Sequence, residues 1–155
     1  MTKQTQKGFM DDDLNRKILD EFLSDSRRSF REIARSLDIA PGTVVSRVNQ
    51  AESLGIIEKY TAKLNHKALG LDVTAIFRVT VAERGLLDPK HPIYKRHGVF
   101  AVYGVTGDAD AIIIGKFADT DKLYEFTQWL NDLKEVDGSH TNVVLSTGKE
   151  DYNSI

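Results

Sequence analysis

Apolar residues recur with the spacing of an α-helix in two neighbouring segments between Ser26 and Gly55. One face of the first segment carries Phe30, Ile33, Ala34 and Leu37. The pattern breaks at residues 38–42, where Pro41 is suited to the first turn of a new helix. The spacing resumes from Thr43 to Leu54, with Val45 beside an apolar face made of Val44, Val48 and Ala51. The pattern predicts two short amphipathic helices joined by a tight turn.

The polar face of the second predicted helix has no acidic residue. It consists of Thr43, Ser46, Arg47, Asn49 and Gln50. Such side chains can hydrogen-bond to base edges or phosphates. The arrangement is typical of a helix-turn-helix, whose second helix enters the major groove of DNA. The alternative is a packed helical pair whose polar face is only solvated.

The residues before this pair complete a predicted three-helix core. Residues 1–10 are polar and predict a flexible tail. A helix then opens at residues 11–13, where three aspartates face the positive end of the helix dipole and one can cap it. Its apolar stripe is Leu14, Ile18, Leu19 and Phe22. Arg27 and Arg28 lie where they can contact the duplex backbone, with solvated loop charges as the alternative. Arg31 and Arg47 are candidates for contact with phosphate or guanine.

Gly55 ends the second helix of the pair as a C-terminal cap. Residues 56–64 are β-prone and predict a short strand or wing, and residues 65–70 predict a turn. We therefore place the helix-turn-helix domain at 11–60, a linker strand and hinge at 61–72, and a second domain at 73–150.

The second half of the chain has the patterns of an α+β domain. Residues 72–81 alternate between apolar and polar positions, and 99–105, 111–117 and 138–145 predict three further strands. A helix begins at Asp119, whereas Pro89 and Pro92 restrict any helix in 84–98 to a short segment around 91–97. The order is β-α-β-β-α-β, the ferredoxin-like arrangement. One face of such a sheet remains open, and pairing with the sheet of a second copy would cover it.

Composition and charge narrow the function classes. The 155 residues carry a net charge of −2, but residues 27–63 hold seven basic and four acidic side chains. The excess suits DNA, and it is small enough that two linked copies would be needed for useful affinity. No apolar run is long enough to span a membrane, the N-terminus does not resemble a secretory signal, and cysteine is absent. These features fit a cytoplasmic protein.

The sequence argues against an enzyme or a metal protein. His66, His91, His97 and His140 are scattered, and neither a zinc-binding His-Glu motif nor a nucleophile-elbow serine occurs. The three aspartates at 11–13 are better explained as helix-start residues than as metal ligands. We expect no catalytic residues and no cofactor.

In combination these motifs resemble the Lrp/AsnC family of transcription regulators. The family's helix-turn-helix pattern lies over residues 14–57 without a gap, and its linker strand matches residues 60–62. The matching positions are Pro41, Arg47, Val48, Glu52, Gly55 and Ile57. The family's Gly-Asp-x-Asp turn stands at residues 107–110. The chain departs from the family at Asn15, Ala40 and Ala51, where an acid, a cap serine and a leucine are usual, and in its short, proline-rich segment 84–98.

The resemblance implies an assembly, a DNA target and an effector. Members of the family form dimers through back-to-back sheets, often assembled into octamers, and bind palindromic DNA with paired helices. Many sense an amino acid between subunits near the Gly-Asp-x-Asp turn, in their ligand-binding and oligomerisation (RAM) domain. By position, that pocket would be lined by Gly107, Asp108, Asp110, Thr141, Val143 and Val144. Ordinary turn chemistry is the alternative for the two aspartates.

The leading hypothesis is therefore a sequence-specific, nucleoid-associated DNA-binding regulator modulated by a small amino acid. The alternatives are a DNA-binding architectural protein of low specificity and a stand-alone amino-acid sensor.

Overall fold

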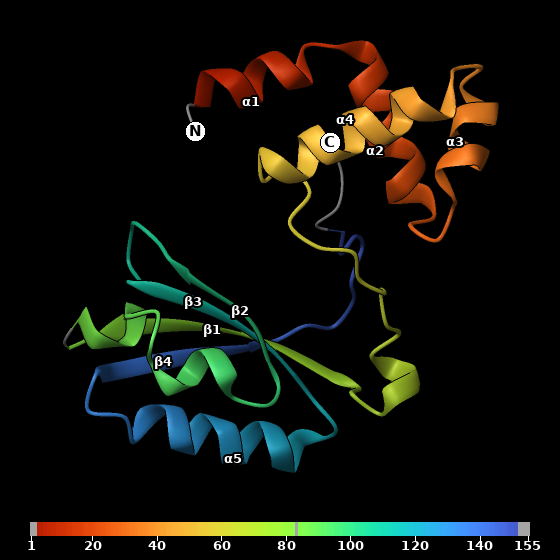
Figure 1. The fold of residues 1–155 in the computed structure, drawn as a ribbon. Helices are drawn as coiled ribbons and strands as arrows, with labels where there is room; N and C mark the ends of the chain where they lie inside the picture. The colour runs from red at the N-terminus through yellow and green to blue at the C-terminus, as the bar shows by residue number, and fades with distance from the viewer. Residues whose placement is uncertain (1–2, 83, 152–155) are drawn as a thin grey trace. The chain divides into compact units, whose positions relative to one another are not determined.

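The computed structural model describes residues 3–82 and 84–151, which divide into two compact units. The first unit comprises the described residues up to Lys63 together with those from Lys149 onward, and the second is Leu64–Gly148. Figure 1 labels their helices and strands. No helix among the described residues is both long and apolar enough to cross a membrane.

The first unit is helical, with α1 at Lys3–Met10, α2 at Asp13–Ser24, α3 at Phe30–Ser36 and α4 at Pro41–Ser53. The predicted three-helix core of α2, α3 and α4 is confirmed. Its buried side chains are Ile18, Phe22, Ile33, Ala34, Val44 and Val48. Asp12 caps α2 by accepting a hydrogen bond from the Leu14 amide, and Ser29 with Glu32 forms a capping box on α3.

The prediction of a flexible tail at residues 1–10 is wrong for the described residues 3–10, which form α1. Phe9 is buried and packs in one cluster with Leu19, Ala51 and Leu54. The Gln6 side chain also donates a hydrogen bond to the carbonyl oxygen of Leu54, at 2.7 Å. A short polar helix is marginal by itself, so these tertiary contacts stabilise α1.

The prediction of a strand at residues 56–64 is also wrong, because no strand forms there. The Gly55 amide donates to Glu52 and the Ile56 amide to Ala51, and Gly55 has a φ of 67°, which together make a Schellman cap on α4. Beyond the cap, the Tyr60 hydroxyl donates to Glu52 on α4 at 2.9 Å. Burial and this hydrogen bond raise the pKa of Tyr60 to about 12. Within the described residues, no neighbouring strand pairs with this segment, as a β-ladder requires.

The second unit is a four-stranded antiparallel sheet in the order β2-β3-β1-β4. Its strands are β1 at Val73–Val81, β2 at Val99–Gly104, β3 at Ala111–Phe117 and β4 at Val136–Val143. This is the predicted ferredoxin-like order. The last strand starts two residues before the predicted bound of 138 and stops at Val143.

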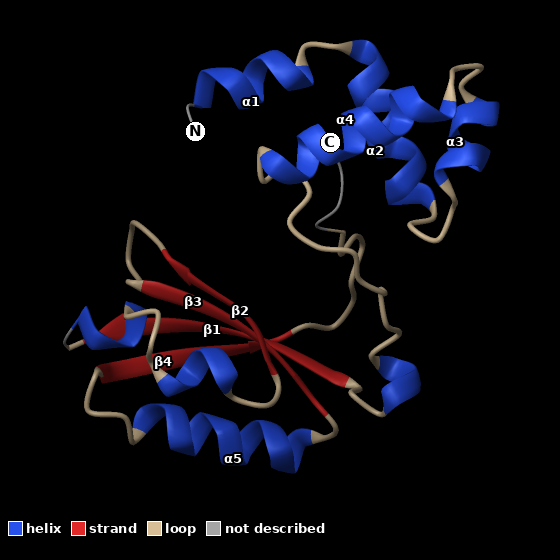
Figure 2. Ribbon diagram, viewed as in Figure 1, coloured by secondary structure: helices blue, strands red, loops and turns tan. Residues whose placement is uncertain are grey.

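The helical connections cover one face of this sheet. Figure 2 shows α5 (Thr120–Asn131) running across it, beginning after the N-cap Asp119. The first connection contains two 3₁₀ turns, η2 at Arg84–Leu87 and η3 at Pro92–Lys95, in place of an α-helix, and a third such turn, η1 (Lys67–Leu69), precedes β1. The core combines Phe77 of β1, Ile113 of β3 and Phe126 of α5 with Leu86 and Ile93 from η2 and η3.

The opposite face of the sheet carries apolar side chains without a covering layer in this unit. Ile76, Ile112 and Ile114 are half-buried there, and Tyr103, which lies across from Ile112, is exposed. Strand alternation separates these residues from the buried face.

Candidate nucleic-acid interface and effector turn

The polar face of α4 is accessible to a duplex. Ser46, Asn49 and Gln50 are exposed and Thr43 is half-exposed, while Val44 and Val48 turn into the core. The helix starts at Pro41 without a side-chain cap, because Ala40 has no polar side-chain atom. The sequence-predicted base-contacting residues therefore lie on one accessible surface.

Arg47 is the exception, because its guanidinium is engaged by hydrogen bonds to other residues of the same unit. Its Nη1 atom lies 2.6 Å from Oδ2 of Asp12 and 2.9 Å from Oδ1 of Asn15. The hydrogen bond from Arg47 is the main cause that lowers the pKa of Asp12 below its usual value. Asn15 is buried, and its Nδ2 donates to the carbonyl oxygen of Phe9 at 2.7 Å. One network thus joins the end of α1, the start of α2 and the middle of α4.

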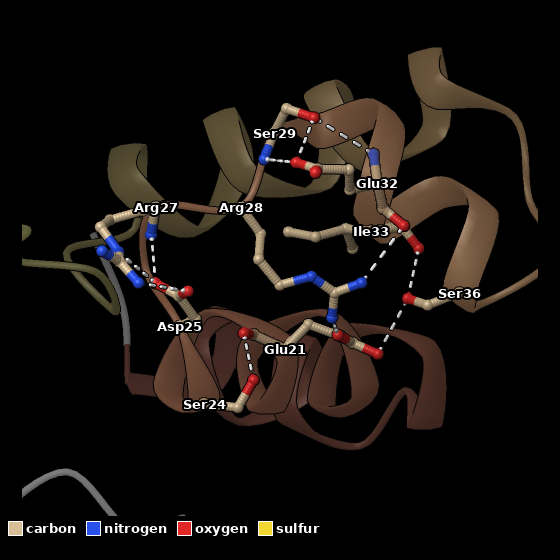
Figure 3. A network of polar contacts seen from close by, with 9 residues as sticks. All are labelled: Glu21, Ser24, Asp25, Arg27, Arg28, Ser29, Glu32, Ile33 and Ser36. Atoms are coloured by element: carbon tan, nitrogen blue, oxygen red, sulfur yellow. Dashed lines mark hydrogen bonds and ion pairs between the residues drawn. The ribbon is translucent and has the colours of Figure 1, made fainter.

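Arg27 and Arg28 also have acidic partners, as Figure 3 shows. The Arg27 side chain contacts both carboxylate oxygens of Asp25, each at 3.0 Å, and this pairing lowers the pKa of Asp25. Arg28 forms an ion pair with Glu21 on α2, while the Glu21 carboxylate also accepts a hydrogen bond from Ser36 on α3. Arg28 thus links α2 to α3, since it also donates to the Glu32 carbonyl oxygen, whereas the exposed Arg27–Asp25 pair lies within the connecting loop.

Arg31 differs from its neighbours. It is exposed on the first turn of α3, and its side chain has no hydrogen bond or ion pair with another residue of the described ranges. Of the arginines proposed for phosphate contact, it can reach a duplex without first breaking a contact within the protein.

The Gly-Asp-x-Asp turn closes one end of the sheet. Gly107 has a φ of 120°, a conformation that favours glycine. Asp108 pairs with Arg78 at 3.0 Å, and Oδ2 of Asp110 accepts a hydrogen bond from the Val81 amide at 2.9 Å. Both carboxylates therefore contact residues of β1 within the same unit.

An open hollow of about 790 Å³ adjoins this turn. It is bordered by Val81, Ala82, Leu87, Asp88, Pro89, Gly104, Val105 and Asp110. The proline-rich segment that replaces the usual first helix forms one wall, with Asp110 at the border.

Within one copy of the chain, the predicted effector residues do not come together. Thr141 and Val143 lie opposite Phe77 and Ala75 of β1. Asp110 instead donates its amide to the Val79 carbonyl oxygen and accepts a hydrogen bond from the Val81 amide. Val144 lies one residue further on, where its amide donates to Thr74. From Val79, Ala75 is four residues away along β1, about 13 Å, and Phe77 is two residues away, about 7 Å, so the end of β4 at Val143 is distant from the turn.

The described residues contain no group of three potential metal-binding side chains. Asp12 serves as a helix cap, and His91 accepts a hydrogen bond from the Ile93 amide at the start of η3. These positions have structural roles.

The sequence pattern did not reveal α1 or the partners of Arg47. The one signal in the sequence is Asn15, which stands where an acid is usual in the family. Its contacts show a small polar residue that can both donate to Phe9 and accept from Arg47.

Comparison with known proteins matches each half of the chain to a protein-family model. Residues 11–58 match the winged helix-turn-helix DNA-binding model, and residues 74–154 match the Lrp/AsnC ligand binding domain. An uncharacterised HTH-type transcriptional regulator from Pyrococcus horikoshii is 38% identical over 141 residues, which cover 91% of this chain and 95% of the relative.

Solved structures agree with this assignment. LrpC of Bacillus subtilis superposes with a TM-score of 0.80 at 28% identity, covering 90% of this chain and 98% of LrpC. A Neisseria meningitidis transcriptional regulator in complex with L-methionine has the same fold, with a TM-score of 0.86, 23% identity and coverage of 93% and 96%.

The helix-turn-helix and the ferredoxin-like sheet define a two-domain DNA-binding transcriptional regulator rather than an enzyme. The chain belongs to the Lrp/AsnC family.

Proposed function

We propose that this chain is a sequence-specific transcriptional regulator whose DNA binding responds to a small amino acid. The observation that carries the first part is the exposed, acid-free face of α4. Thr43, Ser46, Asn49 and Gln50 would contact base edges there. Arg31, with Arg27 and Arg28 after exchange of their acidic partners for phosphate, would hold the backbone. Arg47 would act through its contacts with Asp12 and Asn15, which position α4.

The functional unit would be a dimer or a larger even-numbered assembly such as an octamer. The small positive excess of one helix-turn-helix supports this proposal, because a single copy would bind weakly. The apolar open face of the sheet, with Ile76, Ile112, Ile114 and Tyr103, provides a surface for a second copy. In such a dimer two copies of α4 would meet the duplex about 34 Å apart, one helical turn.

The effector site would lie at the Gly-Asp-x-Asp turn. Exposed turn amides suit a carboxylate, and an acidic side chain suits an α-amino group. Gly107, Asp108 and Asp110 would supply these groups, and the neighbouring hollow would hold the side chain. Val143 and Val144 lie four or more residues along the sheet from the position of Asp110, so in this site they would come from a second copy. Thr141 lies two residues along the sheet from that position and would form a further wall. The L-methionine complex of the Neisseria regulator supports an amino acid as the ligand class.

Selection of duplexes from a randomised pool by the full chain tests the DNA function. We expect an enriched palindromic sequence that is bound at least a thousandfold more tightly than random DNA at a fixed, stated salt concentration, as is typical of specific regulators. A ratio near one would instead indicate an architectural protein, and no DNA binding at all would leave a stand-alone sensor. Native mass spectrometry of the same protein, with and without added amino acids, tests the effector and the assembly.

A further inference from the structure

An exposed apolar side chain, Val45, lies at the border between the core face and the polar face of the recognition helix. Val45 is 37% exposed, although α4 has a core face in which Val44 and Val48 are buried. It occupies the fifth position of α4, in the half of a recognition helix that contacts base edges. Asn49 follows four residues later, so the two side chains are neighbours on the same helix surface.

The same helix has few side chains that can make the usual hydrogen bonds to guanine. The commonest specific contact to guanine comes from an arginine or lysine that reaches O6 and N7. Arg47 is the single basic residue in the sequence of α4, and its Nη1 is engaged by Asp12 and Asn15. The remaining polar groups include the two amides Asn49 and Gln50, whose paired donor and acceptor match N6 and N7 of adenine.

We propose that α4 reads A·T base pairs in the major groove, with Val45 against the C5-methyl group of a thymine and Asn49 on an adjacent adenine. This inference rests on the proposed DNA-binding function and names what that function recognises. A thymine methyl gives an apolar side chain a partner that no other standard base provides, and burying both removes apolar surface from water.

The first test removes single methyl groups from the DNA. The full-length chain is used to select a duplex, and each thymine in it is replaced in turn by deoxyuridine, which lacks only the C5-methyl group. We expect one replacement per half-site to lower the affinity of the wild type about fourfold, as for the burial of one methyl group. Val45→Ala should bind the thymine and uracil duplexes equally. Leu23→Ala, which shortens an exposed apolar side chain on α2, is the matched control and should retain the difference.

The second test removes a single acceptor. Replacing an adenine next to that thymine by 7-deazaadenine deletes N7. We expect this replacement to lower the affinity of the wild type for the duplex about tenfold and to leave the affinity of Asn49→Ala unchanged. Val45→Ala should still discriminate the two adenines, which separates the two contacts.

Three results would overturn the inference without touching the proposed function: an enriched duplex whose essential positions are guanines, an equal uracil penalty in the wild type and Val45→Ala, or the absence of any uracil penalty in the wild type. Failure to enrich any duplex from the pool would overturn the proposed function itself, and the inference with it.

Discussion

Arg47 in the middle of α4 and Asp12 at the start of α2 form an ion pair of 2.6 Å across 35 residues of sequence. Both side chains are about one-third exposed, so solvent screens the pair. Its value lies in its geometry: Asn15 holds the same guanidinium nitrogen from a buried position. The network fixes the orientation of the recognition helix relative to α2.

Removing Arg47 should therefore weaken binding to all sequences alike. We expect Arg47→Ala to lower affinity for a selected duplex and for random DNA by about tenfold each, measured by fluorescence anisotropy at fixed salt. Asp12→Ala should reproduce part of this loss, and the double variant should be no worse than Arg47→Ala, because the two residues act through one contact. Arg96→Ala, in the other unit, controls for the lost charge. Relaxed preference at one base position in Arg47→Ala would show that Arg47 reads a base instead.

The same pair predicts a pH dependence of stability. The pKa of Asp12 is lowered from 3.8 in the folded protein, chiefly by the hydrogen bond from Arg47. Its stabilising contribution is then complete above pH 3.8 and is lost as the pH falls through the lowered value. Asp12→Asn keeps a capping side chain but loses the charge. We expect it to be less stable than the wild type in urea at pH 7, with the difference shrinking below about pH 4. A difference that is constant down to pH 3 would contradict this assignment, and Asp20→Asn on the exposed surface of α2 is the matched substitution.

The effects of substitutions at Phe9 and Ala51 on the free energy of unfolding should depend on each other. Ala51 stands where a larger leucine was expected, and the buried ring of Phe9 packs into the same cluster. Phe9→Ala should lower the free energy of unfolding by about 3 kcal/mol through the cavity it leaves. Ala51→Leu alone should cost about 1–3 kcal/mol by overpacking.

The double variant decides between coupling and independence. Because leucine can fill space that phenylalanine vacates, Phe9→Ala with Ala51→Leu should lose less stability than the sum of the single changes. Urea unfolding of the four proteins measures this directly. Strictly additive losses would show that the two sites do not share space.

Substitutions of Asp108 and Asp110 should distinguish a role of the turn in effector binding from a role in stability. Asp108→Ala breaks an exposed pair with Arg78, which should cost less than about 1 kcal/mol. Asp110→Ala removes the acceptor of the Val81 amide and should cost roughly 1 kcal/mol. If the turn binds an amino acid, L-methionine or another responsive amino acid should raise the melting temperature of the wild type. Both variants should then show a smaller rise. An unchanged rise in Asp110→Ala would exclude that aspartate from the effector site.

Local patterns were sufficient where an element depends on its own residues. The strand at β3 matches the predicted bounds 111–117, and α5 starts at Thr120, one residue after the predicted start at Asp119. Gly55 takes the left-handed conformation that its position after α4 required. Pro89 and Pro92 correctly indicated that 84–98 would not form a long helix.

Patterns failed where an element depends on distant residues. The stretch that forms α1 has few apolar residues, and its order comes from Phe9, which packs against residues of α2 and α4. Residues 56–64 have β-prone side chains, yet within the described chain no neighbouring strand completes a ladder there.

The sequence by itself determined the helix-turn-helix, the order of the sheet and the acid-free face of α4. These follow from the spacing of apolar residues, proline and glycine, which act within a few positions of the chain. The tertiary structure alone decided that Arg47 is held by Asp12 and Asn15, that Asp110 caps the end of β1, and that the turn lies far from Val143. Side-chain partners separated by tens of residues meet only after packing, so no local pattern encodes them.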